Sequence, residues 1–366
     1  MKIDQWGNRL YTGETSYDFV GKRRTWYAIA ALVVVVSVLA LLLRGFNLGI
    51  DFTGGAEFRV SNVQGELTEL DAPEAVEDVL GTTEVQATVI GGDTVRVRTG
   101  DVSTADSAAI VSNLAEVYDV PESDVTFSFI GPNWGADVSQ RALQALVVFL
   151  VLVGLVIAVY FRTWKMSVAA LVALGHDILI TVGIYALIGL EVTPSTVIGF
   201  LTILGYSLYD TVVVFDKVRE NTEGILDQDT YTYREAANKA VNQTLIRSIN
   251  TSVVALLPVG SILFIGALLL GAGTLLDLSL ALFVGIAVGT YSSIFLATPL
   301  LVQLREREPA FVEHERRVLA RRAARPPVPA GTLPQDDEDL LYDRSTLAER
   351  QAGQRLQPRR GHRSRR

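Results

Sequence analysis

The sequence predicts an α-helical membrane protein with six transmembrane helices and a small α+β domain between the first and second helix. Hydrophobic residues make up 49% of the 366 residues, more than a soluble protein can bury while it covers its surface with charge. These residues are clustered, and the stretches 26–43 and 143–161 contain no charged residue. Because about 20 helical residues cross the hydrocarbon core of a bilayer, such stretches predict membrane spans.

Four further apolar stretches complete the set of predicted spans. The first span follows three consecutive basic residues, but no small-residue cleavage site of a signal peptide follows it, so we expect a retained membrane anchor. The six predicted spans are residues 26–43, 142–160, 167–190, 195–215, 245–270 and 275–301.

Lysine and arginine in the connecting loops predict the orientation of the chain. The segment before the first span and the loops after the second and fourth spans are basic, whereas the loops after the third and fifth spans contain no lysine or arginine. Because basic loops remain on the cytoplasmic side, we expect both termini in the cytoplasm and the long insert on the extracytoplasmic side.

The insert is predicted to have the ferredoxin-like order strand–helix–strand–strand–helix–strand. Apolar residues alternate with polar ones around 58–60, 85–89, 95–97 and 125–129, and they recur at helical spacing over 72–80 and 109–117. Sixteen carboxylates lie between residues 51 and 124, against three arginines. A Ca²⁺ site is the alternative use of these acids, but dispersed carboxylates more often form a solvated surface, so no metal is expected.

The chain therefore divides into five predicted parts. Residues 1–25 form a cytoplasmic N-terminal segment, 26–44 the first span, 45–135 the extracytoplasmic domain and 136–303 the bundle of the other five spans. The tail, 304–366, carries fifteen arginines against ten carboxylates, and we expect disorder beyond a short helix near 311–324. A solvated tail that fixes topology is favoured, so no nucleic-acid partner is expected; binding to anionic lipid or ribosomal RNA is the alternative.

Enzymatic chemistry finds little support in the sequence. There is no cysteine, which excludes disulfides and thiolate chemistry, and the three histidines are too scattered for a metal cluster. The sequence also has no nucleophile–base pattern and no phosphate-binding loop. We therefore expect neither an enzyme nor a bound metal.

Three ionisable residues lie inside predicted spans, where a charge is costly and usually marks a pathway or a relay. Asp177 lies near the middle of the third span beside His176, while Asp210 and Arg247 lie in the inner halves of the fourth and fifth spans. Two side chains at one depth on consecutive helices can pair, and such a pair is suited to a proton relay. The nearby polar residues expected to hold water or orient the carboxylate are Ser207, Asn250, Thr251 and Ser252.

Static roles are the alternatives for these residues. Asp210 and Arg247 could form an ion pair that only fixes helix packing, and His176 could simply provide a hydrogen-bond partner for Asp177.

In the sixth span, Gly285 and Gly289 are four residues apart and permit close approach of a neighbouring helix.

Five short motifs follow one another along the chain. They are YDFVGK at 17–22, GIDFTGG at 49–55, the stretch 205–221, RSINTS at 247–252 and GTYSSIF at 289–295. In this order they resemble the signatures of the SecF family of bacterial protein-export subunits, and the short insert favours SecF over the related SecD. Two departures are Tyr209, where asparagine is usual, and the leucines on both sides of Asp277, where lysine and phenylalanine are usual.

The resemblance implies a function in protein export. Members of this family act with SecD as a transporter of the resistance–nodulation–division type, which couples the proton-motive force to late steps of preprotein export. The implied partners are SecD, the SecYEG channel, the translocating preprotein and membrane lipids, in the bacterial plasma (inner) membrane. The proton is the implied coupling ion, no cofactor is implied, and Asp210 and Arg247 fall on the family's proton-relay positions.

The junction between the first span and the insert is a predicted hinge. Asp51, Gly54 and Gly55 lie there; glycine permits positive φ, and a buried aspartate can cap backbone amides. An ordinary turn is the alternative.

Two other functions remain open at this point. A small-molecule exporter subunit of the same superfamily would need two large external domains or a substrate cavity. A structural scaffold of the export channel would use Asp210 only for stability, so that its neutralisation would reduce abundance rather than export.

Overall fold

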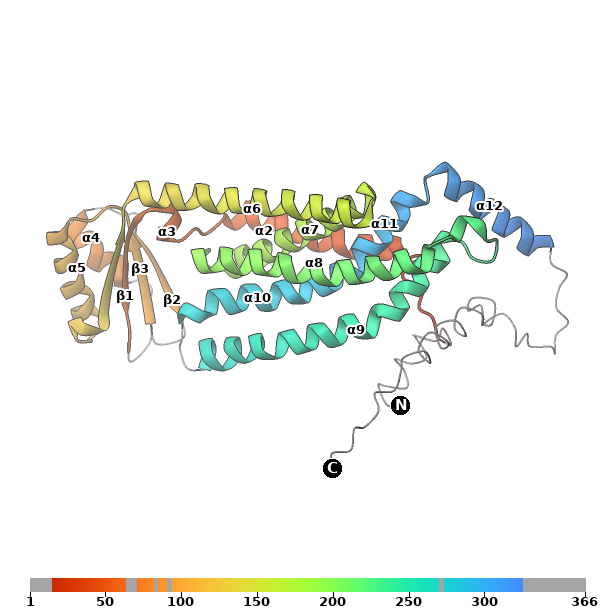
Figure 1. Cartoon of the computed structure of the whole chain (residues 1–366). Helices are drawn as coiled ribbons and strands as arrows, with labels where there is room; N and C mark the ends of the chain where they lie inside the picture. The colour runs from red at the N-terminus through yellow and green to blue at the C-terminus, as the bar shows by residue number, and fades with distance from the viewer. Residues whose placement is uncertain (1–14, 64–70, 82–84, 91–93, 270–272, 325–366) are drawn as a thin grey trace, which may run out of the picture. The chain divides into compact units, whose positions relative to one another are not determined.

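The computed structural model describes residues 15–63, 71–81, 85–90, 94–269 and 273–324 (Figure 1). Within these residues, six helical segments are long and apolar enough to span a membrane, which confirms the predicted fold class. The six segments are Arg23–Arg44, Asn133–Phe161, Trp164–Ile188, Pro194–Asp227, Tyr233–Ala267 and Leu275–Arg305.

The helices of the bundle begin and end at recognisable local signals. Thr193 caps the N-terminus of α8 in a capping box with Thr196, and Thr232 does the same for α9 with Glu235. Helix α7 ends at Gly189, whose φ of 83° suits a glycine at a helix C-terminus. The main helices are α2 (Arg23–Arg44), α6 (Pro132–Phe161), α7 (Trp164–Ile188), α8 (Pro194–Thr222), α9 (Tyr233–Ser261) and α10 (Gly273–Ser292).

Two helices extend well beyond the apolar stretches that predicted them. Helix α6 begins at Pro132, ten residues before the predicted span, and α9 begins at Tyr233, twelve residues before it. Hydropathy marks only the part of a helix that lipid can surround, whereas hydrogen bonding continues through polar residues up to the next cap. Residues 238 and 242 in the early part of α9 are asparagines that hydrogen-bond the backbone of Tyr17, and this contact explains why the polar turns are retained.

Two segments of π-helix interrupt the last two spans. The π-helix η3 (Ile262–Leu269) follows α9, and η4 (Ser293–Ala297) separates α10 from α11 (Thr298–Arg305). Each lies close to a proline, Pro258 in α9 and Pro299 in α11. Proline donates no backbone hydrogen bond, so Pro299 cannot bond the carbonyl of Phe295, and the regular ladder is interrupted within η4.

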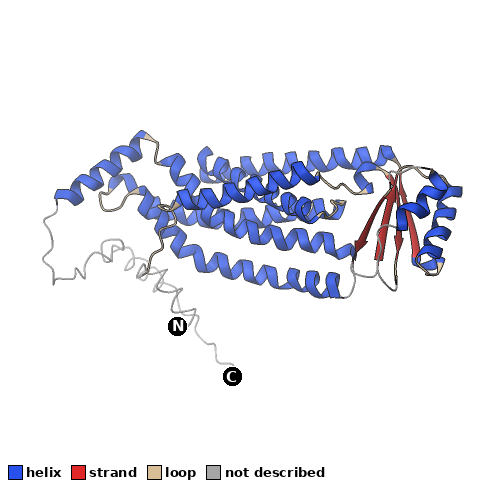
Figure 2. Cartoon of the chain, turned by 180° about the vertical axis from the view of Figure 1, so that it is seen from behind, coloured by secondary structure: helices blue, strands red, loops and turns tan. Residues whose placement is uncertain are grey.

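The insert folds as a four-stranded antiparallel sheet with two helices (Figure 2). The sheet order β2-β3-β1-β4 is that of a ferredoxin-like fold, and the predicted element order is confirmed. A short helix, α3 (Ile50–Thr53), precedes the sheet. The elements of the insert that follow α3 are β1 (Gly55–Val60), α4 (Asp71–Leu80), β2 (Gln86–Ile90), β3 (Thr94–Thr99), α5 (Thr104–Val117), the 3-10 turn η1 (Glu122–Asp124) and β4 (Val125–Ile130).

The two faces of this sheet differ in chemistry. Phe58 and Val97 are completely buried on the face that α4 and α5 cover, where they pack with Ile110 of α5. Successive strand residues point to opposite faces, so the arginines on either side of Val97 lie on the other face. Hydrophobic burial under the helices therefore fixes which face of the sheet presents charge.

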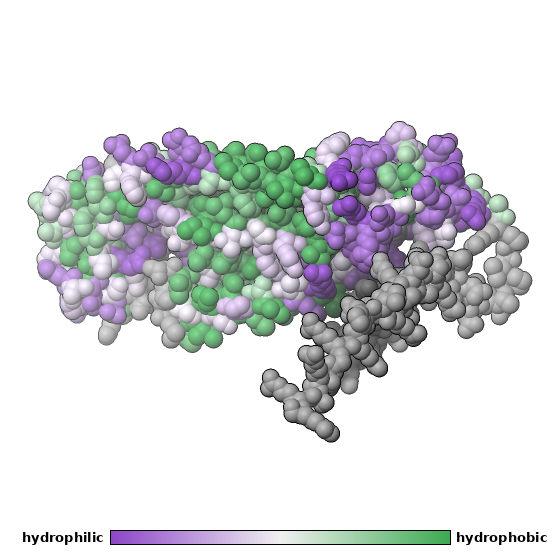
Figure 3. Space-filling model, in the orientation of Figure 1, coloured by the Kyte–Doolittle hydropathy of each residue, from purple (hydrophilic) through white to green (hydrophobic). Residues whose placement is uncertain are grey.

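The surface of the bundle is apolar where lipid would surround it. Large aliphatic side chains are strongly exposed on several helices, such as Leu42 on α2, Val159 on α6 and Val254 on α9. On the face seen in Figure 3, hydrophobic residues cover the middle of the bundle and hydrophilic residues gather toward α11 and α12. A surface of this kind is stable in a bilayer and would promote aggregation in water.

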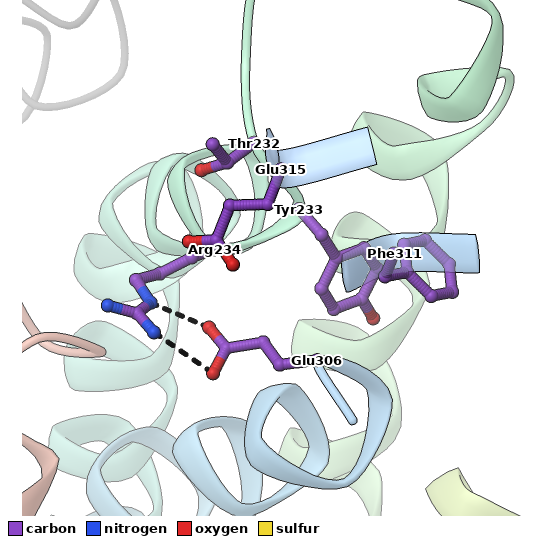
Figure 4. A pocket seen from close by; sticks show the side chains of 6 residues that line it. All are labelled: Thr232, Tyr233, Arg234, Glu306, Phe311 and Glu315. Carbon is purple, nitrogen blue, oxygen red and sulfur yellow. Dashed lines mark hydrogen bonds and ion pairs between the residues drawn. The ribbon is translucent and has the colours of Figure 1, made fainter. Parts of the chain in front are cut away.

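A cluster of charges ties the helix ends together near α12 (Pro309–Ala324) and the turn η2 (Ile225–Asp227). Glu306 accepts hydrogen bonds from Arg234 Nε at 2.6 Å and from Arg23 at 2.8 Å, beside a pocket that Phe311 helps to line (Figure 4). Burial acts to raise the pKa of Glu306, but the hydrogen bonds from the two arginines outweigh it and lower this pKa. The carboxylate is therefore ionised and joins α2, α9 and the end of α11.

The N-terminal residues 1–14 and the tail beyond residue 324 lie outside the described residues, as does the turn at 91–93. The helix expected at 311–324 corresponds to α12, which begins at Pro309. The division of the chain into five parts and the disorder of the tail remain predictions.

Candidate functional site

Asp177 is completely buried in the middle of α7. Its Oδ2 atom accepts hydrogen bonds from Ser207 of α8 at 2.6 Å and from Ser292 of α10 at 2.8 Å. Its Oδ1 atom lies 3.1 Å from Nδ1 of His176. The predicted contact with His176 is therefore present, but two serines from other helices contribute as well.

Asp210 forms a second site of the same kind. The residue lies on α8 and is only 5% exposed. Its Oδ1 atom accepts a hydrogen bond from Ser248 of α9 at 2.7 Å, and its Oδ2 atom accepts one from Ser293. Each aspartate is thus held by two serine hydroxyls that come from neighbouring helices.

The two sites are connected through short stretches of helix. Ser207 and Asp210 are three residues apart, so they lie on one face of α8, while Ser292 and Ser293 are neighbours at the start of the π-helix η4. The wider turn of a π-helix is frequent at functional sites. We refer to these six residues as the carboxylate cluster: Asp177, Asp210, Ser207, Ser248, Ser292 and Ser293.

The carboxylate cluster surrounds two buried acids with hydroxyl donors. Four hydroxyl donors stabilise negative charge on the two aspartates, yet neither carboxylate has a lysine or arginine within 4.0 Å among the described residues. An ionised carboxylate without a lysine or arginine beside it is costly inside an apolar bundle. The described residues contain no group of three or more metal-ligating side chains.

The expected pairing of Asp210 with Arg247 does not occur in this structure. Arg247 is exposed on α9, and its guanidinium donates to the hydroxyl of Tyr209 at 3.4 Å. Consecutive residues on a helix point about 100° apart, and Ser248 occupies the direction that faces Asp210. Equal depth was therefore insufficient, because the rotation of α9 turns Arg247 away from the carboxylate.

The four supporting polar residues also differ from expectation. Ser207 contacts Asp177 rather than Asp210, and Asn250 is exposed. Thr251 donates to the backbone carbonyl of Arg247 one turn earlier, and Ser252 accepts a hydrogen bond from Thr290 at 2.6 Å. Sequence reasoning missed Ser248, Ser292 and Ser293 as ligands, although all three lie within the motifs at 247–252 and 289–295.

Gly285 and Gly289 lie where α10 meets α8. A Cβ atom on Gly285 would lie 2.2 Å from Cδ1 of Ile203, and one on Gly289 would lie 2.9 Å from Cβ of Ser207. Both distances are too short for any larger residue. Gly289 therefore allows the close helix contact that brings Ser292 and Ser207 to the same carboxylate.

The predicted hinge has the backbone conformation that its glycines permit. Gly54 and Gly55 have φ values of 75° and 118°, and a Cβ atom on Gly55 would lie 2.7 Å from the carbonyl oxygen of Thr99. Asp51 does not cap a neighbouring residue, because Gly49 is the N-cap of α3 and Asp51 bonds its own backbone. Burial and the nearby charge of Glu57 raise the pKa of Asp51. Hinge motion itself remains a prediction.

The six-helix bundle, its buried aspartates and its α/β insert are the features of a membrane transport protein. The chain matches the family model "Protein export membrane protein SecD/SecF, C-terminal" over residues 110–307 and the model "SecD/SecF GG Motif" over residues 39–61. It is 47% identical to the protein translocase subunit SecF of Streptomyces coelicolor, over 88% of this chain and 86% of that protein. The chain therefore belongs to the SecD/SecF family of protein export membrane proteins, among its SecF subunits, and is a protein translocase subunit.

A related protein joins SecD and SecF in one chain. The protein translocase subunit SecDF of Thermus thermophilus is 34% identical over 82% of this chain and 40% of its own length. The crystal structure of SecDF, described as a translocon-associated membrane protein, aligns with a TM-score of 0.71 and 32% identity over 80% of this chain. The present chain covers 39% of that SecDF chain, so the fold is shared with less than half of the fused protein.

Replacing Ser207 by alanine tests whether the serines stabilise the buried carboxylates. Ser207→Ala removes one of the two hydroxyls on Oδ2 of Asp177, and we expect the free energy of unfolding to fall by about 1–2 kcal/mol. Ser261→Ala is the control, because this exposed serine donates only to a carbonyl of its own helix. The measurement is reversible unfolding in lipid nanodiscs; equal effects of the two variants would contradict the assignment.

Proposed function

We propose that this chain acts with SecD to couple the proton-motive force to late steps of preprotein export through the SecYEG channel. The observation that supports this function is the carboxylate cluster, which places two aspartates inside a membrane-spanning bundle with no lysine or arginine beside them in the part of the chain that the structure describes. The proton is the coupling ion, and no cofactor takes part.

Protonation changes the hydrogen bonds that hold the bundle together. An ionised Asp210 accepts from both Ser248 and Ser293, whereas the protonated acid donates one hydrogen bond itself. One serine hydroxyl must then turn and accept. Ser293 directly follows Ser292, which donates to Asp177. A change at Asp210 that turns Ser293 therefore alters the second site through two adjacent residues.

The energy available per proton favours small, repeated steps. One charge that crosses about 100 mV releases roughly 2.3 kcal/mol from the membrane potential. This is enough to shift an equilibrium between two arrangements of the chain, but not to pull a folded protein across the membrane. A cycle of small movements that prevents backsliding of the preprotein is therefore the mechanism that we infer.

The exposed face around Arg247 supports the partnership with SecD. Tyr209 is 53% exposed and bonds the guanidinium of the exposed Arg247, and both lie within membrane spans. A guanidinium that faces lipid is costly, so we infer that another membrane protein covers this face and supplies an acceptor. SecD is the candidate, since SecDF contains both subunits in one chain.

The observed hydrogen bonds also permit a second function. All four carboxylate oxygens have a partner, so the carboxylate cluster could serve only to fix the packing of α7, α8, α9 and α10. The chain would then be a structural scaffold of the translocase without proton coupling.

The proposed orientation places both termini in the cytoplasm and the sheet outside the plasma membrane. An alkaline phosphatase fusion at Gly100, between β3 and α5, should be active, because this enzyme becomes active only outside the cytoplasm. A fusion at Asp229 should be inactive. Activity at Asp229 with inactivity at Gly100 would reverse the orientation.

Neutralising Asp210 separates the two functions. We expect Asp210→Asn to reach normal membrane abundance and to reduce secretion by about tenfold or more in cells that lack the native protein, because an amide cannot exchange the proton. Asp216→Asn is the matched control on the same helix, where the side chain is exposed. Secretion equal to that of the control, or loss of the Asp210→Asn protein from the membrane, would favour the scaffold.

A further inference from the structure

The face of the sheet that α4 and α5 leave uncovered carries paired charges. Strand register places Arg59 of β1 opposite Arg96 of β3, and Glu57 opposite Arg98. Arg59 bonds Glu57 within β1 at 3.1 Å. The two arginines of β3 have partners in the sheet as well, since Arg96 lies 3.8 Å from Glu57 and Arg98 donates to Gln86 of β2 at 2.9 Å. Both also extend to residues outside the sheet.

Both arginines of β3 bind one glutamate in the connection between α7 and α8. Arg96 forms an ion pair with Oε2 of Glu191, and Arg98 lies 3.1 Å from its Oε1. The side chain of Glu191 is 5% exposed, and those of Arg96 and Arg98 are 15% and 12% exposed. Buried charges with such geometry are costly to separate, because removal of one partner leaves the others unpaired.

Backbone contacts reinforce the same junction. Arg98 also donates to the carbonyl oxygen of Leu48 at 3.0 Å, just after α2. Leu48 and Val192 form an isolated parallel bridge, in which the amide of Gly49 donates to Val192 at 3.0 Å. The end of α2, the α7–α8 connection and the sheet therefore meet at one place.

The helices that bear the carboxylate cluster end at this junction. Helix α7 carries Asp177, and α8 carries Asp210. The start of α10 is attached as well, because Thr193 donates to Oδ2 of Asp277 at 3.3 Å and Tyr185 bonds the carbonyl of the same residue at 2.5 Å. From the cap of α8 to Asp210 the helix runs for seventeen residues, about 25 Å at 1.5 Å per residue, and it is continuous.

We propose that Arg96, Arg98 and Glu191 form an ionic clamp that transmits movements of α7 and α8 to the α/β domain. The clamp remains closed, and the sheet moves with the ends of these helices as one body. The three side chains are positioning residues that touch neither the proton nor the preprotein. This inference rests on the proposed function, because transmission has a purpose only if the carboxylate cluster drives a movement.

The clamp is tested with Glu191→Gln in the full chain reconstituted with SecD in proteoliposomes, and in secreting cells. Arg59→Gln is the matched control, because it removes a charge from the same face of the sheet without losing a contact to Glu191. The sequence has no cysteine, so spin labels at Val117→Cys and Ile188→Cys, both exposed positions, report the distance between α5 and the end of α7. Proton flux into the vesicles is measured in the same preparation.

We expect one narrow distance distribution in the spin-labelled chain without a further substitution and in the spin-labelled Arg59→Gln variant, with and without a proton gradient. In Glu191→Gln the population of a separated arrangement should rise by about tenfold or more, and secretion should fall while proton flux persists. Should Glu191→Gln reach the membrane poorly, Arg98→Gln, which leaves Arg96 on Glu191, replaces it. A single narrow distance distribution in the clamp variant, or normal secretion by that variant, would contradict the proposed ionic clamp.

Asp210→Asn in the same assays separates this proposal from the proposed function. If Asp210→Asn retains proton flux and secretion, the proton-coupled function is wrong, and the clamp as a transmitter fails with it. If Asp210→Asn abolishes both while Glu191→Gln behaves like Arg59→Gln, only the clamp is wrong.

Discussion

The burial of two carboxylates in an apolar bundle is the constraint on which the rest of the structure depends. Asp177 and Asp210 have no arginine or lysine beside them among the described residues, so serine hydroxyls from α8, α9 and α10 must reach them. A serine side chain is short, and the helices must therefore approach closely. Gly289 permits this approach where α10 meets Ser207, and the π-helix that begins at Ser293 turns two consecutive serines toward two different aspartates.

The same helices continue to the α/β domain, which gives a local change in the bundle a route to a distant domain. Burial of Phe58 and Val97 under α4 and α5 leaves the arginines of β3 on the opposite face, where Glu191 forms an ion pair with each of them. Alternation along a single strand thus decides both the core of the domain and its attachment to the bundle. Coupling between distant sites requires a connected element with two arrangements, and the continuous helix α8 is the element that we propose for this role.

Sequence patterns were sufficient for the architecture and for part of the site. Apolar stretches identified all six spans, and alternation identified every strand of the sheet, because both signals are local. Asp177 and Asp210 were recognisable as charges inside apolar segments. The direction in which Arg247 points could not be predicted from the sequence, since it depends on how α9 is rotated against α8. Glu191 lies 93 residues from Arg98 along the chain, and no local pattern marks a pair so distant. The serines of the carboxylate cluster were missed because an isolated serine in a span usually bonds its own helix.

Proton exchange by the carboxylate cluster is tested most directly by infrared difference spectroscopy. The full chain with SecD in lipid is titrated with acid, and the carbonyl band of a protonated carboxylic acid is followed. If Asp210 exchanges a proton, a reversible band is lost in Asp210→Asn and retained in Asp216→Asn, which removes an exposed carboxylate from the same helix. A spectrum in which Asp210→Asn leaves every titrating band unchanged would contradict it, and the cluster would then be a static element of helix packing.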